Sequence, residues 1–145
     1  MTRTIAFFTD FGSQDIYVGQ LHAAAKKTGS DCPLVDLFHD VNSFDIHAGA
    51  SLLAAMLDYL PHNAIVVGVV DPGVGGKRLP IAVELGERWL VGPDNGLFSR
   101  SVAWSTSEAQ YWTLETSIGV AKTFHGRDVF VPVATDLADG ELGRI

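Results

Sequence analysis

The chain has 145 residues, of which 47% are hydrophobic and 19% charged, which predicts one folded domain over residues 1–145. Its formal net charge of −7 argues against nucleic-acid binding, which requires clustered Lys and Arg. No apolar run approaches the length of a membrane span, and the single cysteine, Cys32, cannot form an internal disulfide. We therefore expect a cytoplasmic protein with neither nucleic-acid nor membrane partners.

Short apolar segments alternate with amphipathic ones in the first part of the chain. Residues 4–9 form an apolar run that is too short for a helix and predicts a buried strand. Ile16–Lys27 has apolar residues at helical spacing, and Leu34–Phe38 predicts a second strand. Residues 46–60 show the clearest helical periodicity, and Pro61 ends the predicted helix.

The same alternation continues to the end of the chain. Residues 64–70 predict a third buried strand, and residues 79–85 and 88–91 predict a hairpin around a glycine turn. Residues 110–114 predict a late strand and residues 128–137 a closing helix. Strands that alternate with helices predict an α/β fold with a mainly parallel sheet covered by helices on both faces.

Two aspartates directly follow predicted strands. Asp10 comes after the first strand and Asp71 after the third, at the sheet edge where α/β proteins bind ligands. An aspartate at such a position is also a common helix cap or turn residue. For Asp10 alone the two interpretations are equally good, whereas the residues after Asp71 favour a functional one.

Asp71 opens a loop with the sequence Asp-Pro-Gly-Val-Gly-Gly-Lys-Arg, residues 71–78. Proline and glycines make a tight loop that a ligand can approach closely. The loop lacks the Gly-Lys-Ser/Thr ending of a phosphate-binding P-loop. Arg78 is far enough along the loop to fold back onto Asp71, in a pair that is either structural or functional.

A histidine in the segment Thr-Phe-His-Gly-Arg-Asp, residues 123–128, favours the functional interpretation. Histidine is the side chain best suited to exchange protons near neutral pH, and Gly126 leaves room for a ligand beside His125. His39 is an intermediate case, because it lies just past the second predicted strand with no partner that the sequence identifies. The remaining histidines are interpreted as structural: His22, His47 and His62.

Four motifs follow one another in a fixed order: TDFG at residues 9–12, VDPGVG at 70–75, GPDNGL at 92–97 and TFHGRD at 123–128. In this order they resemble the S-adenosylmethionine hydroxide adenosyltransferases, relatives of the fluorinating and chlorinating enzymes. The resemblance extends over nearly the whole chain. It implies hydrolysis of S-adenosyl-L-methionine, in which water attacks the 5′ carbon of the ribose and releases adenosine and L-methionine without a cofactor or metal ion.

The resemblance also implies roles for individual residues. Asp71, Arg78 and His125 match the side chains that hold the attacking water, with His125 either orienting the water or taking its proton. Asp10 matches the ligand of the ribose diol. Two aromatic residues match the wall of the pocket: Phe44 and Phe124. In the halogenating relatives Tyr stands at the position of Asp71 and Ser at that of Gly126, so these positions favour water over halide.

The resemblance covers only the amino-terminal domain of the family. A carboxyl-terminal β-barrel normally follows, and the active site lies between the first domain of one subunit and the barrel of its neighbour in a homotrimer. The chain is therefore expected to hold one half of a site. Two alternatives remain: a catalytically silent nucleoside-binding or assembly module, and a metal-dependent hydrolase using Asp10, Asp71, Asp94 and His125, a cation site that Arg78 would disfavour.

Overall fold

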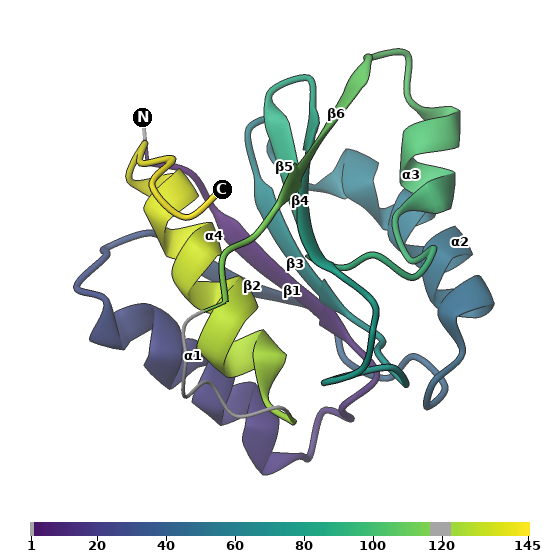
Figure 1. The fold of residues 1–145 in the computed structure, drawn as a ribbon, viewed down its shortest axis with the longest axis horizontal. Helices are drawn as coiled ribbons and strands as arrows, with labels where there is room; N and C mark the ends of the chain where they lie inside the picture. The colour runs from purple at the N-terminus through teal and green to yellow at the C-terminus, as the bar shows by residue number, and fades with distance from the viewer. Residues whose placement is uncertain (1, 117–122) are drawn as a thin grey trace.

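The computed structural model describes residues 2–116 and 123–145, and its centre is a six-stranded sheet with the order β2-β1-β3-β5-β4-β6 (Figure 1). Neighbouring strands from β2 to β5 are parallel, while β4 is antiparallel to both β5 and β6. The predicted α/β fold with a mainly parallel sheet is confirmed, with an antiparallel extension on one side. The strands are β1 (Ile5–Thr9), β2 (Leu34–Phe38), β3 (Ile65–Val69), β4 (Pro80–Leu85), β5 (Arg88–Pro93) and β6 (Ala109–Thr113).

Helices cover both faces of the sheet, as predicted. Figure 1 shows α1 and α4 on one side and α2 and α3 on the other. One apolar cluster joins residues of α1 and α4 to the sheet, and a second joins α2 to the opposite face. The helices are α1 (Ile16–Lys27), α2 (Ile46–Met56), α3 (Ser99–Trp104) and α4 (Val131–Ala138).

Strand β1 shows why the central strands lack a polar face. Ile5 and Phe7 belong to the first apolar cluster, and Ala6 and Phe8 belong to the second. All four side chains are fully buried. Burying a large apolar side chain contributes about 1.5–3 kcal/mol, so the strand is held firmly between two layers of helices. This position makes the carboxyl end of β1 a rigid base for Asp10.

Two helical segments differ from the prediction. Helix α2 ends at Met56, and the chain continues as a 3-10 turn over Leu57–Tyr59 before Pro61. Helix α3 was not predicted, because six residues are too few for apolar side chains to repeat at helical spacing. It packs against α2 and completes the cover on its face of the sheet.

The helical segment at the end of the chain begins at Gly126, before the predicted residue 128, and its first turn is wider than an α-helical turn. Gly126–Phe130 form a π-helical turn that leads directly into α4. The Val131 N–H donates to the Gly126 carbonyl, five residues back, and Pro132 in the first turn of α4 has no N–H to donate. Turns of this kind are frequent at functional sites, and this one places His125 at the start of the helix.

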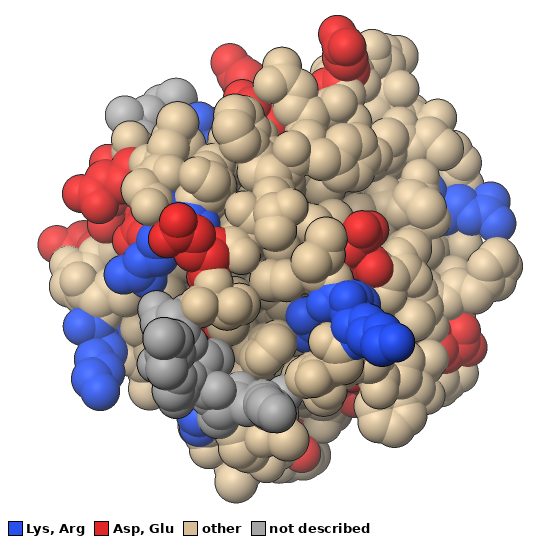
Figure 2. Space-filling model, in the orientation of Figure 1, with Lys and Arg blue, Asp and Glu red and all other residues tan. Residues whose placement is uncertain are grey.

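Charged side chains are dispersed over the face shown in Figure 2, where Lys and Arg alternate with acidic and uncharged residues. The Lys and Arg side chains on this face do not gather into a single patch. In residues 2–116 and 123–145, the structure contains no helix that is both long enough and apolar enough to cross a membrane.

Candidate active site

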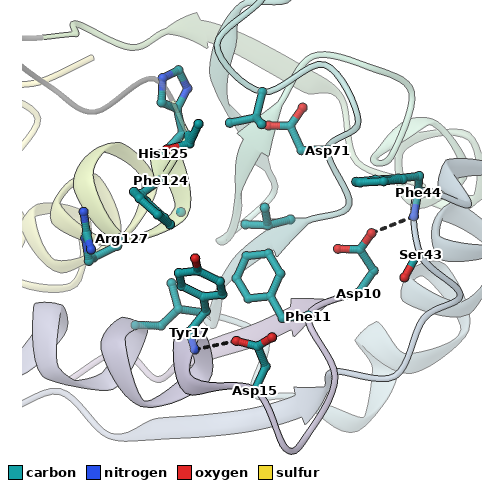
Figure 3. A pocket seen from close by; sticks show the side chains of 15 residues that line it. Asp10, Phe11, Asp15, Tyr17, Ser43, Phe44, Asp71, Phe124, His125 and Arg127 are labelled. Carbon is teal, nitrogen blue, oxygen red and sulfur yellow. Dashed lines mark hydrogen bonds between the residues drawn. The ribbon is translucent and has the colours of Figure 1, made fainter.

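A cavity of about 540 Å³ lies beyond the carboxyl ends of β1 and β3 (Figure 3). Its wall comes from loops that are far apart in the sequence, as expected for a ligand site in an α/β sheet. Five of the six predicted site residues line it: Asp10, Phe44, Asp71, Phe124 and His125. Arg78 does not line the cavity but contacts two residues that do.

Arg78 bridges Asp71 and His125. Its Nε lies 3.1 Å from Asp71 Oδ1, and its Nη2 donates to Asp71 Oδ2. The same Nη2 lies 3.0 Å from Nδ1 of His125. Only 3% of the Asp71 side chain and 9% of the Arg78 side chain are exposed, so water screens this ion pair little. The predicted pairing of Arg78 with Asp71 is confirmed, and its contact with His125 joins all three side chains.

The contact with Arg78 determines where the proton of His125 lies. A guanidinium has only donors, so Nδ1 of His125 must accept and the ring proton lies on Nε2. Burial lowers the pKa of His125 below its usual value of 6.5, and the positive charge of Arg78 lowers it further. The imidazole is therefore neutral at pH 7 and presents Nε2–H as a donor.

Backbone contacts hold the Asp71 loop at the end of β3. The Asn95 side-chain amide donates to the Val70 carbonyl at 2.9 Å, which ties the GPDNGL segment to the residue before Asp71. Within the loop, the Val74 N–H donates to the Asp71 carbonyl. The Arg78 guanidinium lies 5.6 Å from the centre of the Phe130 ring, at a cation–π distance. These contacts hold Asp71 and Arg78 in place at the end of β3.

Asp10 holds the backbone of Phe44. Its Oδ2 accepts a hydrogen bond of 2.7 Å from the Phe44 N–H, marked in Figure 3. Phe44 has a φ of 61° and is the one non-glycine residue with a positive φ among residues 2–116 and 123–145. Such a conformation is strained for a bulky residue and often marks a ligand site. Burial raises the pKa of Asp10 above its usual 3.8, although the hydrogen bond from Phe44 acts in the opposite direction.

An aromatic group forms the other side of the cavity. The rings of Tyr17 and Phe124 lie 5.1 Å apart, those of Phe11 and Tyr17 lie 6.1 Å apart, and the guanidinium of Arg127 lies 4.6 Å from the Phe124 ring. The sequence identified Phe124 but missed Phe11 and Tyr17 as lining residues. Both lie in or just after the TDFG motif, so their position in the sequence was the available signal.

The four proposed metal ligands do not come together. Asp94 lines a separate, smaller pocket beside α3, whereas Asp10, Asp71 and His125 line the main cavity. In the part of the chain that the structure describes, no three His, Cys, Asp or Glu side chains are grouped so that they could hold a metal ion. Arg78 places a positive charge between Asp71 and His125, where a metal ion would have to bind.

The fold and cavity define an α/β domain with a ligand site at the sheet edge, and comparison with known proteins gives its family. Residues 5–144 match the SAM hydroxide adenosyltransferase N-terminal domain. The chain belongs to this family, and the resemblance inferred from the four motifs is confirmed.

Curated relatives and solved structures agree with this assignment. The chain is 41% identical over 143 residues to a protein of Salinispora arenicola and 39% identical over 150 residues to one of Thermus thermophilus, both named (R)-S-adenosyl-L-methionine hydrolase. These matches cover 96% and 95% of the chain but 54% and 58% of the relatives. A solved conserved hypothetical protein from Thermus thermophilus superimposes with a TM-score of 0.80 at 38% identity, over 96% of this chain and 55% of that one. The chain thus spans about half the length of its relatives.

Proposed function

We propose that residues 1–145 act as the amino-terminal domain of an enzyme that hydrolyses S-adenosyl-L-methionine to adenosine and L-methionine. The observation that carries this proposal is the bridge of Arg78 between Asp71 and His125 at the wall of the cavity. The relatives' names support the same substrate. Because the chain spans about half of those relatives, the proposal concerns the whole protein, with no cofactor.

The three side chains can position one water molecule. Asp71 accepts a hydrogen bond from the water, because a carboxylate that binds Arg78 still has free lone pairs. His125 donates its Nε2–H to the water oxygen, which orients a lone pair toward the 5′ carbon of the ribose. Arg78 pairs with the Asp71 carboxylate and keeps His125 neutral. Fixed groups of this kind need no reorganisation during the reaction, which is how enzymes stabilise changing charge most effectively.

The reaction balances without a strong base. The water oxygen forms a bond to the 5′ carbon while the carbon–sulfur bond breaks, and the electron pair moves to sulfur to give the neutral thioether of methionine. The newly formed hydroxyl starts with an extra proton and is strongly acidic, so a weakly basic carboxylate such as Asp71 can accept that proton and pass it to solvent. Loss of the sulfonium charge is favoured in a cavity that excludes bulk water.

Asp10 binds the ribose in this proposal, and the aromatic residues enclose it. A carboxylate can accept hydrogen bonds from two adjacent hydroxyls, and the free lone pairs of Asp10 face the cavity. Phe44 and Phe124 lie on opposite sides of the space in front of it (Figure 3). This arrangement gives the sugar a polar contact on one edge and apolar contacts on its faces.

The test is incubation of the full-length protein with S-adenosyl-L-methionine and analysis of the products. A sulfonium with three different carbon substituents is a stereocentre, and the relatives' names specify an (R) form, so each sulfur epimer is supplied separately. We expect adenosine and L-methionine in equal amounts, with one oxygen from ¹⁸O-water in the adenosine. Adenosine without the ¹⁸O label, or no product from either epimer, would refute the proposal.

A silent nucleoside-binding or assembly module is the second candidate, and the aromatic residues that line the cavity support nucleoside binding. Calorimetry that detects adenosine binding by a protein without turnover would support it.

We further propose a homotrimer in the cytoplasm. Sedimentation of the full-length protein at micromolar concentration tests the homotrimer, and a species of another size would contradict it.

A further inference from the structure

A chain of hydrogen bonds runs from the exposed edge of the sheet to the base of the candidate site. Asp36, on the edge strand β2, has a side chain that is 44% exposed. Its Oδ1 lies 2.8 Å from His39 Nε2, and His39 Nδ1 lies 2.8 Å from Thr9 Oγ1. The His39 side chain is 5% exposed and Thr9 is fully buried, so the inner part of the chain is shielded from water.

Chemistry determines the direction of these bonds. The Asp36 carboxylate only accepts, so His39 carries a proton on Nε2. In the tautomer with its one proton on Nε2, Nδ1 is an acceptor, and the Thr9 hydroxyl donates to it. Thr9 Oγ1 in turn accepts the Phe11 N–H at 3.1 Å. A second histidine, His22 on α1, also bonds to Asp36 Oδ1, at 2.8 Å.

The end of this chain fixes the segment that carries Asp10. Thr9 and Phe11 flank Asp10, and the Thr9 hydroxyl bonds both to His39 Nδ1 and to the Phe11 N–H. The Gly12 N–H donates to the His39 carbonyl at 2.7 Å, which joins the same two segments through the backbone. Asp10 and Phe11 both line the cavity, and Figure 3 shows them pointing into it from the end of β1.

We propose that His39 is a positioning residue, held by Asp36, which through the Thr9 hydroxyl sets the orientation of Asp10 and thereby the affinity for the ribose of the substrate. The proposal rests on the proposed function, because it takes Asp10 to be the ribose ligand. It assigns a role to the histidine for which the sequence identified no partner.

A purely structural role predicts a different behaviour. Burying a hydroxyl and an imidazole is costly unless both are hydrogen-bonded, and two apolar residues of similar shape could fill the same space at little cost to stability. If the network is only structural, removal of one of its members should therefore change the melting temperature and leave KM and kcat unchanged. A positioning network affects the KM for the substrate, because a misplaced ligand weakens binding before it affects the bond-breaking step at Asp71.

The matched variants are Thr9→Val and Thr9→Ser in the full-length protein. Valine keeps the shape of threonine and removes the hydroxyl, whereas serine keeps the hydroxyl. We expect Thr9→Val to raise KM for S-adenosyl-L-methionine about 3- to 10-fold, the range that one lost hydrogen bond gives, with kcat changed less than about twofold. Thr9→Ser should stay near wild type. Equal KM values for the two variants, or a fall in kcat alone, would overturn the proposal.

A variant outside the cavity strengthens the test. Asp36→Ala removes the partner of His39 at a half-exposed position and should also raise KM. The control is His62→Gln, an exposed histidine just before the amino-terminal end of β3, away from the cavity at its carboxyl end, which should leave KM unchanged. If Asp36→Ala behaves like the control, the network does not reach the site.

Nitrogen-15 spectra of the histidine rings test the network without any assay of activity. We expect His39 to carry its proton on Nε2 and to show an accepting Nδ1, and Thr9→Val to change the Nδ1 signal. A proton on Nδ1 in the neutral ring would refute the network itself. If the full-length wild type does not hydrolyse S-adenosyl-L-methionine, the proposed function fails, and adenosine affinity then replaces KM as the measure of positioning.

Discussion

Arg78 places one positive charge against an anion on one side and a neutral ring on the other. The guanidinium donates to both, and burial together with its charge lowers the pKa of His125, so the imidazole stays neutral. Nε and Nη2 donate to the Asp71 carboxylate, and Nη2 also donates to Nδ1 of His125. The arrangement therefore depends on the fork shape of arginine as well as on its charge.

Replacement of Arg78 by Lys tests that dependence. Lysine keeps the charge but cannot make the paired contact to Asp71 and reach His125 at the same time. We expect kcat for hydrolysis by the full-length protein to fall about 10²- to 10³-fold, the cost of losing one well-placed polar group, with little change in melting temperature. A turnover number within threefold of wild type would contradict the role given to the guanidinium.

Asp10→Asn should separate binding from stability. Burial raises the pKa of Asp10 above 3.8, so the folded protein holds this proton more tightly than the unfolded chain does. The contribution of Asp10 to the free energy of unfolding is therefore greatest at low pH and is lost as the pH rises through the raised pKa. Asn carries no charge and should remove this loss while it weakens substrate binding.

The measurement is urea unfolding of both proteins at about pH 4 and pH 7, with KM at pH 7. We expect the stability of the Asn variant relative to wild type to increase between the two pH values, and its KM to be several-fold higher. A variant that loses stability relative to wild type over this range would show that the carboxylate is favoured by the fold.

The residues of the site that could be predicted were those whose partners are close in sequence or in a motif. Arg78 and Asp71 share one short loop, so their pairing follows from a tight turn. His39 and Thr9 are separated by 30 positions, and their bond depends on how β1 and β2 pair. Sequence periodicity does not contain that information, so the network around His39 could be found only in three dimensions.

Strands β3 and β5 approach each other closely at two glycines. A Cβ on Gly92 would lie 2.2 Å from the carbonyl oxygen of Gly68, and a Cβ on Gly68 would lie 2.8 Å from the Phe98 ring. The missing side chains let Phe98 and Leu97 pack directly onto the sheet. This packing brings the segment after β5, including Asn95, against the end of β3 beside Asp71.

Gly92→Ala and Gly19→Ala are a matched pair of substitutions, the first at a close contact between two strands and the second on the exposed side of a helix. The first places a methyl group against backbone that cannot move away and should destabilise the fold by about 3 kcal/mol or more. The second lies on the exposed side of α1 with no atom within 4 Å of the new Cβ, and should stabilise it by roughly 0.5–1 kcal/mol. Urea unfolding measures both, and changes of the same sign would contradict this account.

Element prediction succeeded where a pattern was long or fully apolar. Helix α1 was predicted with its observed bounds, and each observed strand lies within two residues of its predicted bounds. Helix α3 was missed because its six residues contain too little periodicity. The π-helical turn at Gly126–Phe130 was missed because no local sequence pattern specifies a turn of this kind.

The whole molecule carries a net charge of −7 and spans about half the length of its curated relatives. Among the residues that the structure describes, three aspartates line the cavity, Asp10, Asp15 and Asp71, together with the basic residues Arg127 and His125. A substrate with one net positive charge, as S-adenosyl-L-methionine has, is therefore attracted to this part of the protein.

Salt should weaken that attraction. We expect KM for S-adenosyl-L-methionine to rise a few-fold as ionic strength increases from about 0.01 to 0.5 M, because the screening length falls from about 30 Å to a few ångströms. The value of kcat should stay nearly constant. Adenosine, which is uncharged, serves as the control ligand, and an equal loss of adenosine affinity would show that salt acts on the fold.

The positive φ of Phe44 makes two walls of the cavity interdependent. The carboxylate of Asp10 accepts the Phe44 N–H and so holds a backbone conformation that the phenyl side chain disfavours, which links the acid in one wall of the cavity to the ring in another. Loss of that acid would remove the hydrogen bond that holds this conformation of Phe44. A change at position 10 thus reshapes both the polar and the apolar side of the pocket, and new substrate preferences at this site would require paired substitutions at positions 10 and 44.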